Sequence, residues 1–281
     1  MKIEEIDPLI ESALREDMPE GDITSESVVP PDSVSRAVIV AKEAGVLAGV
    51  DVAGRVFEKI DQTIKFQKVF EDGQDFQPGD ILARLEGNSI SLLKGERTAL
   101  NFLQRLSGIA TKTRHYVDAV AGTRTKILDT RKTTPTLRLL EKYAVRMGGG
   151  VNHRFSLSDM VLIKDNHLRL AGSITQAVRR AKEKAKPGVK IEVEVTNFAE
   201  AKEAVEAGAS MIMLDNMSMS GMKQVLDWVK GRVPVEVSGK VSLRKARGIA
   251  GLGVDYISVG GLTHSFSSVD ISMEFEDNQN E

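Results

Sequence analysis

Residues 190–261 decide the fold, and they read KIEVEVTNFAEAKEAVEAGASMIMLDNMSMSGMKQVLDWVKGRVPVEVSGKVSLRKARGIAGLGVDYISVGG. Four short apolar segments in this stretch begin at intervals of roughly twenty residues: 190–195, 211–214, 235–237 and 256–259. Helical patterns lie between them, for example over 198–207 and 219–229. This alternation predicts parallel strands joined by helical crossovers, and hence an α/β fold.

Two more strands are predicted upstream of this stretch, at 126–128 and 160–163. Gly and polar residues follow the strands, as in a barrel that carries its site at the carboxyl ends of its strands. An open, doubly wound sheet would show the same alternation of elements. The residues alone therefore leave two arrangements of the parallel sheet.

The first hundred residues have a different pattern, which predicts a small α+β unit. The predicted elements are helices at 3–15 and 50–60, strands at 34–40, 63–70 and 81–85, and a loop at 17–31. A long helical pattern then runs over about 91–120, and Gly108 could break it. Because the local pattern changes there, we place the domain boundary at this point, with domains 1–108 and 109–281.

The composition argues against several classes of protein. The 38 Lys and Arg residues and 40 Asp and Glu residues give a net charge of −2, which does not favour nucleic acid or membrane as the main partner. The chain has no Cys, so it has no disulfide, thiol nucleophile or Cys-ligated metal. No apolar run approaches the ~20 residues that span a bilayer, and the acidic N-terminal segment lacks the apolar core of a signal peptide. We therefore expect a soluble cytoplasmic protein.

Residues 128–167, LDTRKTTPTLRLLEKYAVRMGGGVNHRFSLSDMVLIKDNH, hold a local excess of positive charge, with seven Arg or Lys against four acids. In a nearly neutral chain, this excess predicts a site for a small polyanion. Arg131, Arg154 and Lys164 are the main candidates, because they lie among turn and strand-end residues and Arg offers a planar donor fork to carboxylate or phosphate. His153 could orient or protonate a ligand, although a lone His is more often structural, and His167 is a weaker candidate.

The remaining cations of this block, Arg138, Lys142 and Arg146, recur at four-residue steps. That spacing places them on one side of a helix. We expect them on its outer face, where they could meet a partner subunit.

Acidic residues occur in two of the predicted strands. Glu192 and Glu194 are two apart in IEVEV, so both point to the same side of the sheet. Two carboxylates in one space are costly unless they meet cations, a metal or hydroxyl donors, whereas on an exposed edge strand they would need none of these. Asp215 follows MIML, where it could bind a metal or sugar hydroxyls or simply cap the next helix.

Glycine pairs follow the last two predicted strands, in Ser238-Gly239 and Gly260-Gly261. Glycine after a strand lets backbone N–H groups approach a phosphate, and barrels often bind phosphate at the loops after their last two strands. Each pair alone is weak evidence, because many strand-to-helix turns use glycine. The two pairs together favour a phosphate site.

The block 128–167 closely resembles the central block of the quinolinate phosphoribosyltransferases, also called nicotinate-nucleotide pyrophosphorylases (carboxylating). Further matches are GERTALNFLQRLSGIAT (95–111), EVEV (192–195), MLDNMS (213–218), EVSGKVSL (236–243) and ISVGGLTHS (257–265). REDMPEGDIT and AKEAGVLAG, near the start of the chain, are also similar. The resemblance covers almost the whole chain.

This resemblance implies an N-terminal α/β sandwich domain followed by an irregular, open α/β barrel of parallel strands, with the last residues returning to the first domain. It implies an enzyme that joins quinolinate to phosphoribosyl pyrophosphate and releases pyrophosphate and CO2, giving nicotinate mononucleotide for NAD biosynthesis. It also implies a need for Mg²⁺. The expected assembly is a homodimer in which each active site borrows residues from the neighbouring subunit.

The resemblance also implies roles for single residues. Arg97 would bind quinolinate from the partner subunit, and the other quinolinate ligands would be Arg131, His153, Arg154 and Lys164. Lys132 would contact the phosphoribosyl donor. Glu194 and Asp215 would lie at the ribose hydroxyls and hydrated Mg²⁺, so that Lys132, Glu194 and Asp215 form the catalytic set. The 5′-phosphate end would comprise Ser238, Gly239, Lys240, Gly260, Gly261 and His264.

Two positions depart from the pattern that the family often has. Lys240 stands where a second Gly is usual, which puts the backbone geometry there in question but could add charge to the phosphate site. Gly261 stands where Ala is usual, which is a mild change.

Three rival functions have some support in the sequence. One is a related phosphoribosyltransferase that acts on nicotinate, or the relative found with molybdate transport. A second is a Schiff-base aldolase with Lys164 as the barrel lysine, which the Arg cluster disfavours. A third is a carrier domain, because residues 69–87 resemble the lipoyl or biotinyl hammerhead, but Gly87-Asn88 offers no lysine for modification.

Overall fold

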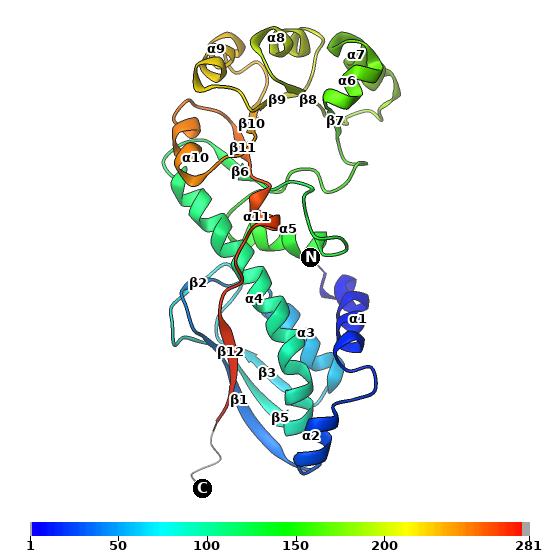
Figure 1. Cartoon of the computed structure of the whole chain (residues 1–281), viewed down its shortest axis with the longest axis vertical. Coiled ribbons are helices and arrows are strands. Elements are labelled where there is room, and N and C mark those ends of the chain that lie inside the picture. Colours follow the sequence, from blue (N-terminus) through cyan, green and yellow to red (C-terminus); the bar gives the residue numbers. More distant parts are fainter. Residues whose placement is uncertain (1, 277–281) are drawn as a thin grey trace. The chain divides into compact units, whose positions relative to one another are not determined.

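The structure, a computed structural model, describes residues 2–276 and divides into two compact units (Figure 1). Unit 1 takes in the described residues up to 112, residues 139–149 and the described residues from 266 onward. Unit 2 takes in residues 113–138 and 150–265. No helix in the described part of the chain is both long and apolar enough to cross a membrane.

Unit 2 is built on a parallel sheet of six strands in the order β6-β11-β10-β9-β8-β7. Their bounds are β6 Lys126–Leu128, β7 Val161–Ile163, β8 Ile191–Val195, β9 Met211–Asp215, β10 Val235–Ser238 and β11 Tyr256–Ser258. The strands β7 to β11 lie side by side in the same order as in the sequence. β6, the first strand in the sequence, pairs with β11, the last, as the first and last strands of a closed barrel do. The sheet is therefore a barrel left open between β6 and β7, which excludes the doubly wound alternative and confirms the predicted fold class.

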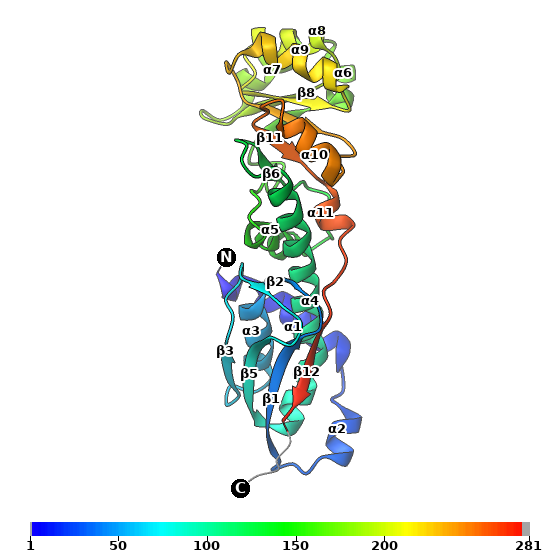
Figure 2. The same ribbon diagram turned by 90° about the vertical axis from the view of Figure 1, so that its left-hand side faces the viewer.

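Helices follow the strands along the outer side of this sheet (Figures 1 and 2). They are α6 Asp165–Ala171, α7 Ile174–Lys184, α8 Phe198–Glu206, α9 Met219–Val229, α10 Leu243–Ala250 and α11 Gly261–His264. The side chains of Ser173, Asn197, Ser218 and Ser242 cap four of them by accepting a backbone N–H from the first turn. Each strand thus ends in a turn to a helix, and these turns gather at the carboxyl ends of the strands.

Unit 1 contains an antiparallel sheet in the order β12-β1-β5-β3 and a two-stranded sheet of β2 and β4. The strands are β1 Val34–Ala41, β2 Gly45–Val46, β3 Lys65–Lys68, β4 Asp75–Phe76, β5 Ile81–Asn88 and β12 Ile271–Phe275. The helices are a 3-10 turn η1 Ile3–Ile6, α1 Asp7–Asp17, α2 Ile23–Val28, α3 Val50–Ile60, and most of α4 Ser89–Ala119 and α5 Arg138–Met147. β12 brings the C-terminal segment back beside β1, and the core includes Phe57, Phe76 and Ile39.

Three details of unit 1 differ from the sequence predictions. The segment predicted as a loop contains α2, which Asp22 caps by accepting the N–H of Ser25 at 3.0 Å. Gly108 does not break α4, because a Cβ there would lie 2.1 Å from the carbonyl oxygen of Ser267, so the glycine serves close packing instead. Gly87 and Asn88 lie within β5, paired with β1, and not at a hairpin tip, which contradicts the carrier alternative.

Candidate active site

A pocket of about 880 Å³ lies at the carboxyl ends of the unit 2 strands. Of the fourteen residues that the sequence predicts for the site, thirteen line it: Arg131, Lys132, His153, Arg154, Lys164, Glu194, Asp215, Ser238, Gly239, Lys240, Gly260, Gly261 and His264. Parallel strands explain most of this gathering, because most of these residues lie near the end of a strand or in the segment that follows one. His153 and Arg154 instead follow Val151, which forms an isolated parallel bridge with Leu128 of β6. Arg97 is the exception, since it lies on α4 in unit 1 with an exposed side chain.

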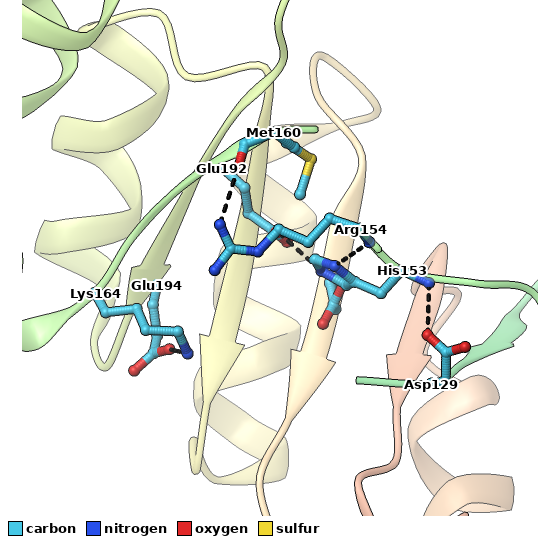
Figure 3. A network of polar contacts seen from close by, with 8 residues as sticks. Asp129, His153, Arg154, Met160, Lys164, Glu192 and Glu194 are labelled. Atoms are coloured by element: carbon cyan, nitrogen blue, oxygen red, sulfur yellow. Dashed lines mark hydrogen bonds and ion pairs between the residues drawn. The ribbon is translucent and has the colours of Figure 1, made fainter. Parts of the chain in front are cut away.

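Lys164 and Glu194 form an ion pair inside the pocket (Figure 3). Lys164 follows β7, Glu194 lies in the neighbouring β8, and Lys164 Nζ is 2.8 Å from Glu194 Oε2. His167 supports this arrangement from α6, where its Nδ1 accepts the backbone N–H of Lys164 at 3.0 Å. A lysine held by a carboxylate is a poor candidate for a Schiff-base nucleophile, which needs a neutral amine.

Arg131 and Arg154 bring two guanidinium groups to the same pocket wall. Burial lowers the pKa of Arg154, and the positive charge of Arg131 lowers it further. Arg154 Nη1 donates to the carbonyl oxygen of Met160 at 3.0 Å, whereas the buried Nε of Arg131 has no partner. Two adjacent cations with a spare donor form a site that an anion would stabilise.

His153, Glu192 and Glu236 form a buried trio at this pocket, and His153 and Glu236 are among the lining residues. His153 Nε2 is 3.1 Å from Glu192 Oε2 and 3.3 Å from Glu236 Oε2, and both carboxylates are fully buried. The buried Asp129 fixes the backbone of His153 by accepting its N–H at 2.8 Å (Figure 3). The trio can hold a proton or, by its donor set, a cation.

The His153 ring has both nitrogens engaged within the protein. Nδ1 accepts the backbone N–H of Arg154 at 2.7 Å, so Nε2 carries the hydrogen that faces the two glutamates. Burial, foremost, raises the pKa of Glu192 to about 7, so this carboxyl can hold a proton near neutral pH. The hydrogen bond from the Arg154 amide needs a lone pair on Nδ1, so the His153 ring is neutral. Any further proton held by the trio is therefore on one of the two glutamates. His153 is therefore better suited to orienting Arg154 than to donating to a ligand.

The turns after β9 and β10 interlock at the other end of the pocket. Gly239 has a φ of +104°, and a Cβ there would lie 2.2 Å from Asn216 Oδ1. At Gly260, an added Cβ would lie 3.0 Å from Lys132 Cδ and 3.2 Å from His264 Nε2. Gly239 therefore allows the two turns to pack closely, and Gly260 keeps a space open beside Lys132 and His264.

Sequence reasoning singled out Glu192 as a carboxylate in need of a partner, without assigning it to the substrate site, and it missed Glu236. Each lies in an otherwise largely apolar segment, IEVEV or VPVEV, and an acid within such a segment was the available signal. Glu194 and Glu236 are both level with Met213 of the strand between them, so the alternation places their side chains on one face.

The outer face predicted for α5 is wrong at Lys142, whose side chain is buried. Arg138 is half-buried and donates to Thr133 Oγ1 and to the carbonyl oxygen of Phe155, while Arg146 is exposed. Spacing alone misled here because α5 is covered on more than one side, with Leu140, Glu141, Ala144 and Val145 also buried.

A parallel barrel with paired cations and acids at its carboxyl edge defines an enzyme of the α/β-barrel class that acts on anionic substrates. Two family models match this chain, the quinolinate phosphoribosyl transferase N-terminal domain over residues 22–107 and the C-terminal domain over residues 109–274. The chain belongs to the quinolinate phosphoribosyl transferase family.

Individual relatives cover nearly the whole chain. The probable nicotinate-nucleotide pyrophosphorylase [carboxylating] of Bacillus subtilis is 44% identical over 259 residues, which are 92% of this chain and 89% of that protein. The crystal structure of NadC from Streptococcus pyogenes is similar with a TM-score of 0.95 at 44% identity, covering 99% of both chains. The nicotinate-nucleotide pyrophosphorylase from Francisella tularensis has a TM-score of 0.95 at 39% identity and covers 98% of both.

Proposed function

We propose that this chain transfers the phosphoribosyl group of phosphoribosyl pyrophosphate to quinolinate, with loss of CO2. The products are nicotinate mononucleotide and pyrophosphate, and the reaction serves NAD biosynthesis. The relatives' names support this reaction. The observation that carries it in this chain is the pairing of Arg131 and Arg154 in a pocket that also holds Lys164, Glu194 and Asp215.

Quinolinate carries two carboxylates on a pyridine ring, so it needs several cations around it. Arg131 offers the free Nε, Arg154 is oriented by its own N–H bond to His153, and Lys164 lies on the acidic side of the pocket. A cation bound tightly to the 2-carboxylate would oppose its departure as CO2. The guanidinium groups therefore grip the 3-carboxylate more strongly than the 2-carboxylate.

The donor's phosphates occupy the end of the pocket formed by Lys132, the turns at residues 238–240 and 260–261, and His264. The hydroxyl of Thr263 donates to the carbonyl oxygen of Lys132 at 2.8 Å and so fixes the lysine's backbone. Lys132 then neutralises phosphate charge on the donor. The open space left by Gly260 suits the approach of a phosphate oxygen.

Glu194 and Asp215 suit a hydrated Mg²⁺, which binds proteins through one or two carboxylates and completes its shell with water and substrate phosphates. Both carboxylates line the pocket, and Asp215 Oδ2 accepts from Asn216 at 2.8 Å, which leaves other oxygens for waters. When bound, the ion supplies positive charge for the leaving pyrophosphate. Glu194 and Asp215 also face the ribose, where negative charge stabilises an oxocarbenium-like transition state.

The bond changes follow from this placement. The pyridine nitrogen attacks the anomeric carbon as its bond to the pyrophosphate oxygen breaks, and the pocket lowers the entropic barrier by holding both substrates together. The quaternised ring then loses its 2-carboxylate as CO2, because the positive nitrogen stabilises the electron pair left on carbon 2. A proton from solvent completes nicotinate mononucleotide.

The active enzyme in this proposal is a cytoplasmic homodimer in which the partner subunit supplies the Arg97 guanidinium to quinolinate. The exposure of Arg97 on α4 supports this role, because the side chain is available to a second subunit.

The test is an assay with quinolinate, phosphoribosyl pyrophosphate and Mg²⁺, with nicotinate offered in a parallel reaction. The expected result is nicotinate mononucleotide from quinolinate and none from nicotinate. Turnover of nicotinate alone would instead support the rival phosphoribosyltransferase.

A further inference from the structure

The segment 151–154 enters the opening of the barrel between β6 and β7. Val151 forms a parallel bridge with Leu128 of β6. Its N–H donates to the carbonyl oxygen of Ile127 at 2.8 Å, and its carbonyl oxygen accepts the N–H of Asp129 at 3.2 Å. Because β11 pairs with the other edge of β6, this bridge lies on the edge that faces the opening. The bridge involves a single residue, so the rest of the segment needs support other than strand pairing.

The rest of the segment brings Arg154 close to a second cation, Arg131. Burial and the positive charge of Arg131 both lower the pKa of Arg154, and the second effect reflects repulsion between the two guanidinium groups. Arg131 lies two residues after Asp129, and Arg154 lies three residues after Val151. Unless an anchor joins the two backbones, this repulsion favours separation of the segment from β6.

The side chains of Asp129 and Asn152 provide this anchor, which we call the Asp129–Asn152 clamp. The Asp129 carboxylate is fully buried, and its Oδ1 accepts the backbone N–H of His153 at 2.8 Å (Figure 3). Its Oδ2 accepts from Asn152 Nδ2 at 2.5 Å. Hydrogen bonds to a buried carboxylate are stronger than those between neutral groups. The clamp therefore fixes the backbone from which Arg154 extends beside the segment that leads to Arg131.

We infer that the clamp determines quinolinate affinity, by holding the Arg131 and Arg154 guanidinium groups at the spacing that a substrate carboxylate needs. Asp129 and Asn152 are positioning residues, because neither lines the pocket and both act through residues that do. The inference rests on the proposed function, since it takes quinolinate as the anion between the two guanidinium groups. Pyrophosphate binding should be insensitive to the clamp, because the donor's phosphates occupy the other end of the pocket in that proposal.

A reciprocal exchange of the two side chains tests the clamp. Asp129→Asn turns one acceptor into an NH2 donor, which in either orientation of the amide meets another donor, from His153 or Asn152. Asn152→Asp places two carboxylates against each other. In the double variant Asp129→Asn/Asn152→Asp, the new amide at 129 can accept from His153 and donate to the new carboxylate at 152. Each single variant should therefore bind quinolinate about tenfold or more weakly, and the double variant should recover to within about threefold of the wild type.

Asp72→Asn is the matched structural control. Asp72 accepts the backbone N–H groups of Gly49 and Val50 at 2.9 and 3.0 Å and the hydroxyl of Tyr143 at 2.6 Å, but it lies in unit 1 and does not line this pocket. This control should unfold at a lower temperature and bind quinolinate as the wild type does. Asn152→Ala is a milder variant that introduces no repulsion, and it should weaken quinolinate binding about three- to tenfold even if a single exchange prevents folding.

The deciding measurement is binding of quinolinate and, separately, of pyrophosphate with Mg²⁺ to the full chain by calorimetry. We expect a loss for quinolinate alone in the two single exchanges and in Asn152→Ala, with recovery in the double variant. Unchanged quinolinate binding in Asn152→Ala, equal losses for both ligands, or a folded double variant without recovery would overturn the inference. Because no turnover is needed, failure of the proposed reaction would be seen separately, as absence of nicotinate mononucleotide from the wild type.

Discussion

Lys164 Nζ lies 2.8 Å from Glu194 Oε2, which joins a cation proposed for quinolinate to a carboxylate proposed for the ribose. The Lys164 side chain is 42% exposed and that of Glu194 is 16% exposed, so the cation is the more accessible partner. A substrate carboxylate can therefore approach the exposed part of the Lys164 ammonium while Lys164 keeps its contact with Glu194. This pair lies where the two substrates meet in the proposed reaction.

The pair predicts different kinetic effects for its two members. Lys164→Met should raise KM for quinolinate about tenfold or more, because it removes a charged donor to the substrate. Glu194→Gln should lower kcat about 100-fold with little change in KM for quinolinate, because it removes charge stabilisation from the transition state. Steady-state kinetics with each substrate varied in turn would check both, and the reverse pattern would contradict the roles given to these residues.

Arg131 should be essential for quinolinate binding and dispensable for folding. Arg131→Ala is expected to weaken quinolinate affinity by about 30-fold or more, since it removes a half-buried guanidinium with a free donor. Calorimetric titration with quinolinate measures the loss, and the unfolding temperature should stay within about 2 °C of the wild type. Arg179→Ala is the control, because that Arg lies exposed on α7 and only approaches Glu183. Normal affinity in Arg131→Ala would remove it from the site.

The buried Glu192 should make stability depend on pH. Its pKa rises from 4.5 to about 7, mainly through burial, so the folded state binds more protons than the unfolded state between these values. This contribution is fully present below pH 4.5 and is lost as the pH rises to about 7. Gln at this position cannot ionise. The stability of Glu192→Gln relative to the wild type should therefore be greater at pH 8 than at pH 5, by about 1–3 kcal/mol in the free energy of unfolding. A pH-independent difference would show that Glu192 is ionised throughout.

Two helical glycines should respond in opposite directions to the same substitution. Gly108→Ala should destabilise the protein by about 2–4 kcal/mol, because the new methyl group would meet the Ser267 carbonyl oxygen. Gly248→Ala, on the exposed side of α10, should stabilise it by about 0.5–1 kcal/mol, because only Met219 Cε lies near, at 3.7 Å. Urea denaturation measures both, and a neutral Gly108→Ala would contradict the close packing of α4 on this segment.

A donated Arg97 predicts complementation between inactive subunits. Arg97→Ala and Arg131→Ala homodimers should each lack activity, whereas a heterodimer of the two, purified through different tags after co-expression, has one intact site and should show about half of wild-type activity. No activity in the heterodimer would mean that Arg97 and Arg131 act from the same subunit.

The sequence was sufficient for the strands of unit 2 and for most of the pocket. The repeated strand-helix pattern predicts the parallel strands but leaves their order open between a barrel and a doubly wound sheet. Residues such as Asp215 and Ser238 meet because parallel strands end at one edge. Their positions depend on chain connectivity and a period of two, both of which can be read from residues.

Contacts that depend on the tilt and packing of elements could not be predicted. His153 contacts Glu192 and Glu236, which lie on two different strands. No local sequence pattern indicates that these three residues come together. Gly108 packs against Ser267, which is distant in the chain. Because this contact cannot be read from the local sequence, the glycine was interpreted as a possible helix break. The burial of Lys142 likewise depends on what covers α5.

The most direct test of the central proposal follows the label from quinolinate carrying ¹³C in its 2-carboxylate, incubated with the full chain, phosphoribosyl pyrophosphate and Mg²⁺. The account predicts unlabelled nicotinate mononucleotide with one labelled CO2 and one pyrophosphate for each molecule formed. Label retained in a nucleotide product, or no nucleotide from quinolinate at all, would contradict it.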